Sequence, residues 1–307
     1  MFVGQPKDEA RSLKPTPSLF YVVSKKLLLG FHVSISGSID LAVDRAVEAD
    51  CTAFQMFTRN PRGWQFKPFG QEEVANFIAK RKRAGFERVV VHMPYLPNLA
   101  SPLKEVAKKS RQSLATEVGR CGELGVDYVV AHIGSNMGKG SAAGVRMVIE
   151  ACSEALDANP RSPTRLLVEN MAGQKNCVGA RFEELRMILD GVGKKDRIGV
   201  CFDTAHAFAA GFDLSTKAGA EGTLELFDEI VGIDRMKVVH LNDSKAPLGS
   251  NLDRHEHIGM GFIGEKGFRA FLANPETRRL PLLMETPQDG RRTDAQELAV
   301  VRRLVGA

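Results

Sequence analysis

Cysteine is scarce in this sequence, and its pattern excludes both a disulfide framework and a thiolate metal site. The 307 residues contain five cysteines, an odd number, and no two of them are spaced as Cys-x-x-Cys. Most lie in apolar surroundings, which is typical of reduced core residues in an intracellular protein. We therefore expect a cytoplasmic protein whose cysteines are structural.

Long apolar runs and two common sequence motifs are also absent. No apolar run approaches the ~20 residues that cross a bilayer, so we expect no membrane partner. The sequence contains neither a P-loop nor a Gly-x-Ser-x-Gly segment. It therefore gives no support to a nucleotide cofactor or to serine-hydrolase chemistry.

The overall composition is ordinary for a globular protein, with a small excess of positive charge. Apolar residues make up 43% of the chain and charged residues 26%, and the formal net charge is +5. The length suits one large α/β domain, and no linker indicates a second one. The charge slightly favours a polyanionic partner.

Residues 1–26 differ from the rest because they are polar, contain proline and carry five basic residues against two acidic ones. The apolar core of a secretory signal is missing, and the acidic residues and scarce serines do not favour an organellar transit peptide. We expect a flexible or surface-draped extension ahead of one catalytic domain at residues 27–307.

From residue 27 onward, short apolar runs alternate with longer segments of helical pattern. Eight runs have the length and composition of buried strands: residues 27–33, 52–57, 88–91, 126–131, 165–168, 198–202, 236–239 and 280–284. Amphipathic helices are expected between them at residues 72–84, 105–124, 142–156, 182–189, 220–231 and 295–304. This alternation predicts a parallel (β/α)8 TIM barrel with its active site at the C-terminal ends of the strands.

Six of the eight runs end in a side chain that is costly to bury without a partner. These residues are His92, His132, Glu169, Asp203, His240 and Glu285. A capping aspartate or a hydrogen-bonded core histidine explains any one of them. It does not explain the whole set, because the strand ends of a barrel meet at one face and the six side chains should converge there.

With three further residues, the candidate metal ligands exceed what one ion needs. The additional candidates are His206, Asp253 and His255, which bring the number of candidates to nine. Imidazoles and carboxylates without thiolates suit zinc, with manganese or iron as substitutes. Nine ligands suit two or three ions that share bridging carboxylates. Closely spaced ions polarise a phosphoryl oxygen and activate water, so the pattern favours hydrolysis of a phosphate ester.

The motifs around these residues resemble the endonuclease IV family of apurinic/apyrimidinic (AP) endonucleases, and the resemblance extends from Leu28 to about Leu304. The matching motifs are GFHVS at 30–34, HMPYLPNLA at 92–100, AHIGS at 131–135, VENMAGQ at 168–174, CFDTAH at 201–206, HLNDSK at 240–245, DRHEHIG at 253–259 and ET at 285–286. Each motif is weak alone, but the set occurs in order and at family-like spacing.

That resemblance implies a TIM barrel with three zinc ions that cleaves duplex DNA on the 5′ side of an abasic site. The expected products are a 3′-hydroxyl and a 5′-deoxyribose phosphate, and blocked 3′ ends would also be trimmed. The first zinc would be bound by His92, His132 and Glu169. The second would be bound by Glu169, Asp203, His240 and Glu285, and the third by His206, Asp253 and His255. Glu169, the catalytic residue of the set, would bridge the first two ions, and a hydroxide between them would be the nucleophile.

The resemblance also implies where DNA is bound. Residues 58–64 correspond to the family's first DNA-recognition loop, in which Arg62 would enter the minor groove, while Gly63 replaces a gap-filling side chain. Tyr95 and Leu96 would wedge beside the abasic site, and the alternative for Tyr95 is a core aromatic at the barrel mouth. Lys245 and Arg254 lie near ligands and are candidates either for phosphate contacts or for ordinary solvated surface charge. His32 and His257 match no ligand position. A monomer acting on duplex DNA is expected.

Two alternatives remain open at this stage. A xylose isomerase-like sugar isomerase or epimerase uses one or two divalent metals on a related barrel, but that site leaves Asp253 and His255 unexplained. A catalytically inactive DNA-binding relative would have lost ligands, whereas all nine ligand types are present in this chain.

Overall fold

A closed ring of eight parallel strands forms the centre of the protein. The computed structural model describes Met1 and residues 27–306, so the expected extension at residues 1–26 lies outside the described residues apart from Met1. Within the described part, the strands follow the order β1-β10-β7-β6-β5-β4-β3-β2, which runs around the ring in sequence order. This arrangement confirms the TIM barrel predicted from the alternating pattern.

The barrel strands are short and rich in branched apolar residues, as suits strands buried on both faces. They are β1 (Leu29–Val33), β2 (Phe54–Met56), β3 (Val89–His92), β4 (Tyr128–Ala131), β5 (Arg165–Glu169), β6 (Ile198–Asp203), β7 (Met236–His240) and β10 (Leu282–Met284). Strand β1 pairs in parallel with both β2 and β10. The ring therefore has no free edge.

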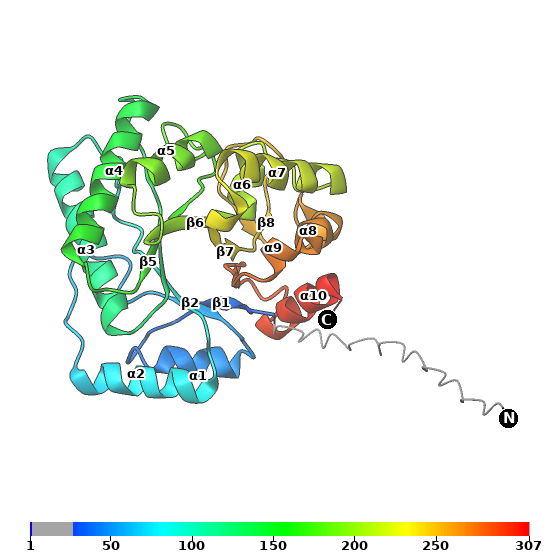
Figure 1. Ribbon diagram of the computed structural model, residues 1–307, viewed down its shortest axis with the longest axis horizontal. Coiled ribbons are helices and arrows are strands. Elements are labelled where there is room, and N and C mark those ends of the chain that lie inside the picture. Colours follow the sequence, from blue (N-terminus) through cyan, green and yellow to red (C-terminus); the bar gives the residue numbers. More distant parts are fainter. Residues whose placement is uncertain (2–26, 307) are drawn as a thin grey trace.

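Helices lie outside the strands (Figure 1). They are α1 (Leu41–Glu48), α2 (Gln71–Ala84), α3 (Lys104–Glu123), α4 (Ser141–Ala158), α5 (Phe182–Val192), α6 (Thr204–Ala209), α7 (Lys217–Ile230), α8 (Gly264–Ala273), α9 (Pro275–Arg278) and α10 (Asp294–Val305), with a 3-10 turn η1 at Ile233–Arg235. The six expected helices are all present, whereas α1, α6, α8 and α9 were not expected. An antiparallel hairpin, β8 (Asp243–Ser244) with β9 (His255–Glu256), follows β7. No helix in the described residues combines the length and apolar character needed to span a membrane.

Two apolar layers hold the strands, one inside the barrel and one beneath the helices. The interior layer consists of Ala53, Val90, Val130, Leu167, Cys201, Val238 and Leu283. The outer layer includes Phe202, whose ring stacks on that of Phe271 from α8. Side chains alternate between the two faces of a strand, so the residue two positions after each interior residue also faces the barrel axis. In six strands this residue is one of the predicted ligands.

Candidate metal centre

The predicted ligands converge at the C-terminal ends of the strands. A cavity of about 220 Å³ opens there, lined by His32, His92, Tyr95, His132, His206, Asp253, His255 and Glu285. Glu169, Asp203 and His240 adjoin these side chains and are fully buried. The two-residue step from the interior apolar layer explains the convergence, because it directs each strand's last inward side chain to the same end of the barrel.

Glu169 lies at the centre of the site, because each of its carboxylate oxygens faces two imidazoles. Its Oε2 lies 3.3 Å from Nε2 of His92 and 3.1 Å from Nε2 of His132. Its Oε1 lies 3.2 Å from Nδ1 of His206 and 3.1 Å from Nδ1 of His240. A carboxylate that directs its two oxygens at different ligand sets has the geometry of a bridge between two cations.

The ligand atoms around this carboxylate form overlapping groups. One group consists of His92, His132 and Glu169, and another of Glu169, Asp203 and His240, with the ligand atoms of each group within 4.8 Å of one another. The nearest carboxylate oxygen of Glu285 lies 3.6 Å from Nδ1 of His240. The groups share Glu169, as two neighbouring cation sites would.

A further group lies beside the β8–β9 hairpin. Nε2 of His206 lies 3.3 Å from Oδ1 of Asp253, and Nε2 of His255 lies 3.4 Å from the same oxygen. Nε2 of His255 also faces Oδ2 of Asp203 at 3.7 Å. This buried nitrogen makes no hydrogen bond within the described part of the chain. A nitrogen lone pair held between two carboxylates fits a divalent cation, so the residues present fit the metal that the donor set implies.

Hydrogen bonds to the far ring nitrogens orient two of the imidazoles. Nδ1 of His92 donates to the carbonyl of Met93 at 2.6 Å. Nδ1 of His206 donates to the carbonyl of Asn170 at 2.9 Å. When neutral, each ring therefore has its lone pair on the Nε2 that faces a carboxylate, which is the form that binds a metal.

His240 presents the opposite ring nitrogen, and Gln55 is the reason. A carboxylate only accepts, so Nε2 of Gln55 donates to Oε1 of Glu285, at 2.8 Å. Oε1 of Gln55 then accepts from Nε2 of His240 at 2.9 Å. In the neutral ring this places the lone pair of His240 on Nδ1, which faces the carboxylates.

Burial and charge act in opposite directions on the carboxylates of the site. Burial raises the pKa of Glu169, but the imidazoles of His240 and His132 outweigh it and hold that pKa well below its usual range. Burial likewise raises the pKa of Asp253, but the hydrogen bond from His206 lowers it to about 2. The site therefore concentrates carboxylate charge that a divalent cation neutralises.

Proteins named endonuclease 4 or endonuclease IV are similar to this chain in sequence and in fold. A family model described as a xylose isomerase-like TIM barrel matches residues 43–304. A probable endonuclease 4 from Methanoculleus marisnigri is 50% identical over 92% of this chain and 100% of its own length. Another, from Nitrosopumilus maritimus, is 46% identical over 88% of this chain and 97% of its own length. Endonuclease IV from Thermus thermophilus has a crystal structure that matches with a TM-score of 0.81 at 40% identity, covering 91% of this chain and 98% of that one.

The chain belongs to the endonuclease IV family of AP endonucleases. This membership confirms the resemblance found in the motifs. A D-tagatose 3-epimerase-like protein matches with a TM-score of 0.68 at 21% identity, over 90% of this chain and 97% of that one. At that identity the match shows the fold alone.

Of the residues that the endonuclease IV resemblance assigns to DNA, Tyr95 lines the cavity. Tyr95 and Leu96, on the loop between β3 and α3, are 59% and 41% exposed, so the reading of Tyr95 as a core aromatic is wrong. The Tyr95 ring lies 6.2 Å from that of His132. Arg62 is exposed on the loop between β2 and α2. A side chain at Gly63 would meet nothing within 4 Å of its Cβ.

The two histidines without a ligand match hold neighbouring segments. His257 is buried and bonds to Glu297 of α10 at 2.5 Å and to Asp289 at 3.0 Å, which fixes the segment that follows the ligands of the hairpin. His32 packs against Phe57, and its Nδ1 lies 3.0 Å from Nε2 of Gln55. His32 also lines the cavity, where its Nδ1 lies 3.6 Å from Oε1 of Glu285.

Three supporting residues were not found from the sequence. Besides Gln55, Asn242 donates to Oδ2 of Asp203 at 2.8 Å, and Asn170 accepts from the Asp203 backbone at 2.7 Å. Both asparagines follow a ligand within the endonuclease IV motifs, so their adjacency was an available signal. For Gln55, the available signal was a single polar residue inside an apolar strand.

A glycine-rich segment near the site has the glycine spacing of a dinucleotide-binding loop, but its backbone N–H groups are not free to bind a ligand. Residues 259–264 are spaced as Gly-x-Gly-x-x-Gly, the spacing typical of such loops. Here the N–H groups of Gly259, Gly261, Ile263 and Gly264 donate to the carboxylate of Asp243, at 2.9–3.2 Å. The amides that would bind a pyrophosphate are already bonded, so this segment stabilises the loop after β9.

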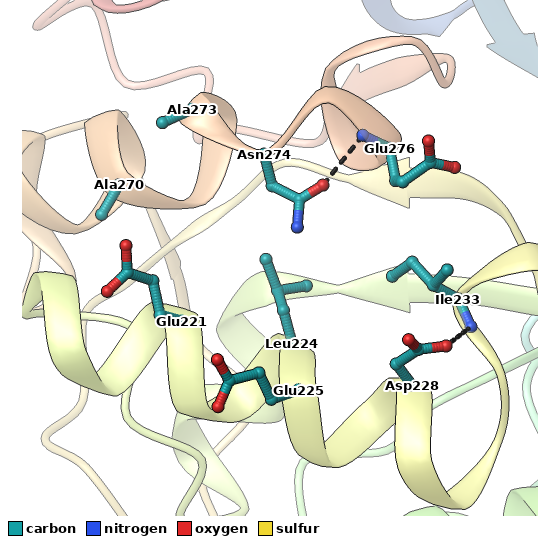
Figure 2. Close-up of a pocket in the computed structure, with 9 residues that line it drawn as sticks. All are labelled: Glu221, Leu224, Glu225, Asp228, Ile233, Ala270, Ala273, Asn274 and Glu276. Carbon is teal, nitrogen blue, oxygen red and sulfur yellow. Dashed lines mark hydrogen bonds between the residues drawn. The ribbon is translucent and has the colours of Figure 1, made fainter.

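Another cavity, of about 310 Å³, lies in the helical layer between α7 and the α8–α9 segment (Figure 2). Leu224, Ile233 and Ala270 contribute its apolar walls, and carboxylates such as Glu221 and Glu225 lie at its rim. Its lining includes no histidine and no cysteine among the described residues. This cavity is therefore separate from the metal centre.

Proposed function

We propose that the protein hydrolyses the phosphodiester bond on the 5′ side of abasic sites in duplex DNA, leaving a 3′-hydroxyl and a 5′-deoxyribose phosphate. Its family supports an endonuclease that acts on DNA. The observation that supports the hydrolytic chemistry is the Glu169 carboxylate, with two imidazoles at each oxygen. Trimming of blocked 3′ ends is a second activity proposed for the same site.

The proposed cofactor is zinc, with three ions per chain and manganese as a substitute. The assigned ligands are His92, His132 and Glu169 for one ion, Glu169, Asp203, His240 and Glu285 for the next, and His206, Asp253 and His255 for the last. Imidazole and carboxylate donors without thiolates support this choice. When bound, the ions would supply Lewis acidity toward the phosphate and lower the pKa of a water molecule to ~7.

The protein's own groups hold this arrangement in place before DNA arrives. Asp203 accepts from Asn242 at Oδ2 and from the backbone N–H of His206 at Oδ1, so its carboxylate has a fixed direction. Gln55 fixes the ring of His240 and the carboxylate of Glu285. Ligands that are oriented in advance lose little entropy when the reaction begins.

Recognition of damage is assigned to exposed side chains on the loops that follow β2 and β3. Arg62 would enter the minor groove, and Tyr95 with Leu96 would occupy the space beside the abasic nucleotide. An abasic nucleotide has neither stacking nor pairing, so its extrusion costs less than that of an intact nucleotide. Lys245 and Arg254 are both exposed and are proposed to contact phosphates. The proposed acting form is a monomer with one catalytic domain at residues 27–307.

One experiment separates this proposal from the sugar isomerase alternative. Metal content per chain and nicking of an abasic duplex are measured on the same preparation, together with conversion of free ketoses. The proposal expects three zinc ions and nicking. One or two ions with sugar conversion and no nicking would support the alternative, for which Asp253 and His255 have no role.

A further inference from the structure

Two buried arginines donate hydrogen bonds to backbone carbonyls of the loop between β2 and α2. Residues 58–69 have no helix or strand, and Arg62 and Trp64 are exposed on them. Arg59, which belongs to the segment, and Arg120, which belongs to α3, are buried, at only 6% and 5% exposed. We call residues 58–69 the recognition segment, because the proposed function assigns it to DNA.

Arg59 holds the middle of the recognition segment. Its Nη1 donates to the carbonyls of Gly63 at 2.9 Å and Trp64 at 3.1 Å. Its Nη2 donates to Oγ of Ser113 at 2.6 Å, and its Nε pairs with Glu117 at 2.5 Å. Ser113 and Glu117 belong to α3, so this guanidinium joins the middle of the segment to the helical wall.

Arg120, also on α3, holds both ends of the recognition segment. Its Nη2 donates to the carbonyl of Thr58 at 2.6 Å, and its Nη1 donates to the carbonyl of Lys67 at 2.9 Å. Its guanidinium lies 3.7 Å from the ring centroid of Phe69. The Thr58 hydroxyl accepts from Nε of Arg120 and donates to Glu117. The two arginines and the glutamate therefore form one connected network.

Burying three charged side chains together is a poor way to stabilise a fold, because each charge must be removed from water. The network contains one buried carboxylate and two buried guanidiniums. The free-energy cost of removing these charges from water often cancels the attraction between them. Apolar side chains of similar size are therefore frequently neutral or stabilising replacements. What apolar side chains cannot do is bind four backbone carbonyls at fixed positions. The distinctive contribution of this network is therefore the position of these four carbonyls.

We propose that Arg59, Glu117 and Arg120 are positioning residues that order the recognition segment before damaged DNA binds. This inference rests on the proposed function. A segment that is already ordered avoids the entropy cost of becoming ordered in the complex, so affinity for DNA rises without any direct contact from these residues.

The test compares two variants with wild type. Arg120→Met removes the bonds to both ends of the segment. The combined variant Arg59→Met, Glu117→Leu, Arg120→Met removes all three charges together, so it leaves no uncompensated buried charge to prevent folding. The matched control is Arg111→Met, which removes a guanidinium of α3 that pairs with Glu150 and Glu154 of α4 instead.

Three quantities are measured on each zinc-loaded protein: amide hydrogen exchange in residues 58–69, the steady-state constants for nicking an abasic duplex, and zinc content. We expect exchange in the segment and KM to rise about tenfold or more in both variants, because ordering is then lost before binding. We expect kcat and zinc content to stay within about twofold of wild type. The control should match wild type throughout.

Unchanged exchange in both variants would overturn the ordering role, and faster exchange with an unchanged KM would overturn the link to DNA. A loss of kcat and zinc equal to the change in KM would show general damage to the barrel and would also overturn the proposal. Wild-type protein that fails to nick abasic duplex would instead overturn the proposed function and, with it, the DNA role of the segment. The exchange data would still report whether the network orders it.

Discussion

Gln55 and His240 are 185 residues apart in the chain, yet a hydrogen bond of 2.9 Å joins their side chains inside the barrel. The same amide of Gln55 donates to Glu285, 230 residues away, at 2.8 Å. One buried side chain thus sets the orientation of two predicted ligands. Outer contacts of this kind are worth about 10- to 100-fold in metal affinity.

Gln55→Leu should therefore weaken zinc binding at the site of His240 and Glu285 by about 10- to 100-fold, because the imidazole loses the partner that fixes its tautomer. Competition against a chromophoric chelator measures this affinity, and nicking should be lost at limiting zinc but partly restored at saturating zinc. The control is Gln112→Leu, a position on the outer face of α3 away from the barrel interior. Equal zinc affinities for Gln55→Leu and wild type would show that the amide does not tune the site.

Glu169→Gln should abolish nicking while the fold stays largely intact. A neutral amide is a poor bridge between two cations, so water in the site would lose its lowered pKa. Turnover is measured at saturating zinc, with circular dichroism as the check on folding. Glu105→Gln, at an exposed glutamate in the first turn of α3, should behave as wild type. Near-wild-type turnover of Glu169→Gln would remove this residue from its proposed role.

Removal of metal should inactivate the protein reversibly. The predicted ligands are imidazoles and carboxylates, and imidazole binds a metal only when it is neutral, so affinity should fall as the pH is lowered and imidazoles become protonated. Prolonged dialysis against a strong chelator should abolish nicking, and added zinc or manganese should restore it. Chelator treatment at about pH 6 should require less time than at about pH 8. Full activity in verifiably metal-free protein would rule out the proposed hydrolysis.

Arg62→Ala combined with Tyr95→Ala should weaken binding to an abasic duplex by a few kcal/mol, the typical cost of unstacking a base step. Undamaged duplex should lose much less affinity, because phosphate contacts dominate its binding. Fluorescence anisotropy at one fixed salt concentration measures both duplexes. Zinc content on the same samples should not change. An equal loss for both duplexes would show that damage is sensed elsewhere.

The barrel and its ligand ring were predictable because both depend on local patterns. An apolar run that ends in a polar residue identifies a strand and its active end, as Val90 and His92 illustrate. Helix α8 was missed for a tertiary reason: Gly264 and Gly267 resemble helix breakers. A Cβ at Gly267 would lie 2.0 Å from the carbonyl oxygen of Leu214. The glycine is thus required by close packing, which a single sequence does not display.

The supporting contacts of the site were less predictable than its ligands. The single polar residue in β2 was visible, but its partners lie far away in the chain, and periodicity does not say which residues they are. The network of Arg59, Glu117 and Arg120 was equally hard to predict. An arginine on a helix, such as Arg120, usually faces solvent. Both depend on which side chains the closed barrel brings together.

The two-residue step between the interior layer and the ligands has a consequence for how such proteins diverge. Leu167 precedes Glu169, and Cys201 precedes Asp203, by the same interval. Because strand side chains alternate, inserting or deleting one residue between them would turn the ligand from the barrel axis toward the helices. We therefore expect changes of length in the loops, where Arg62 and Tyr95 lie. Under the proposed function, preference for a DNA lesion could change through loop length while the metal ligands keep their positions.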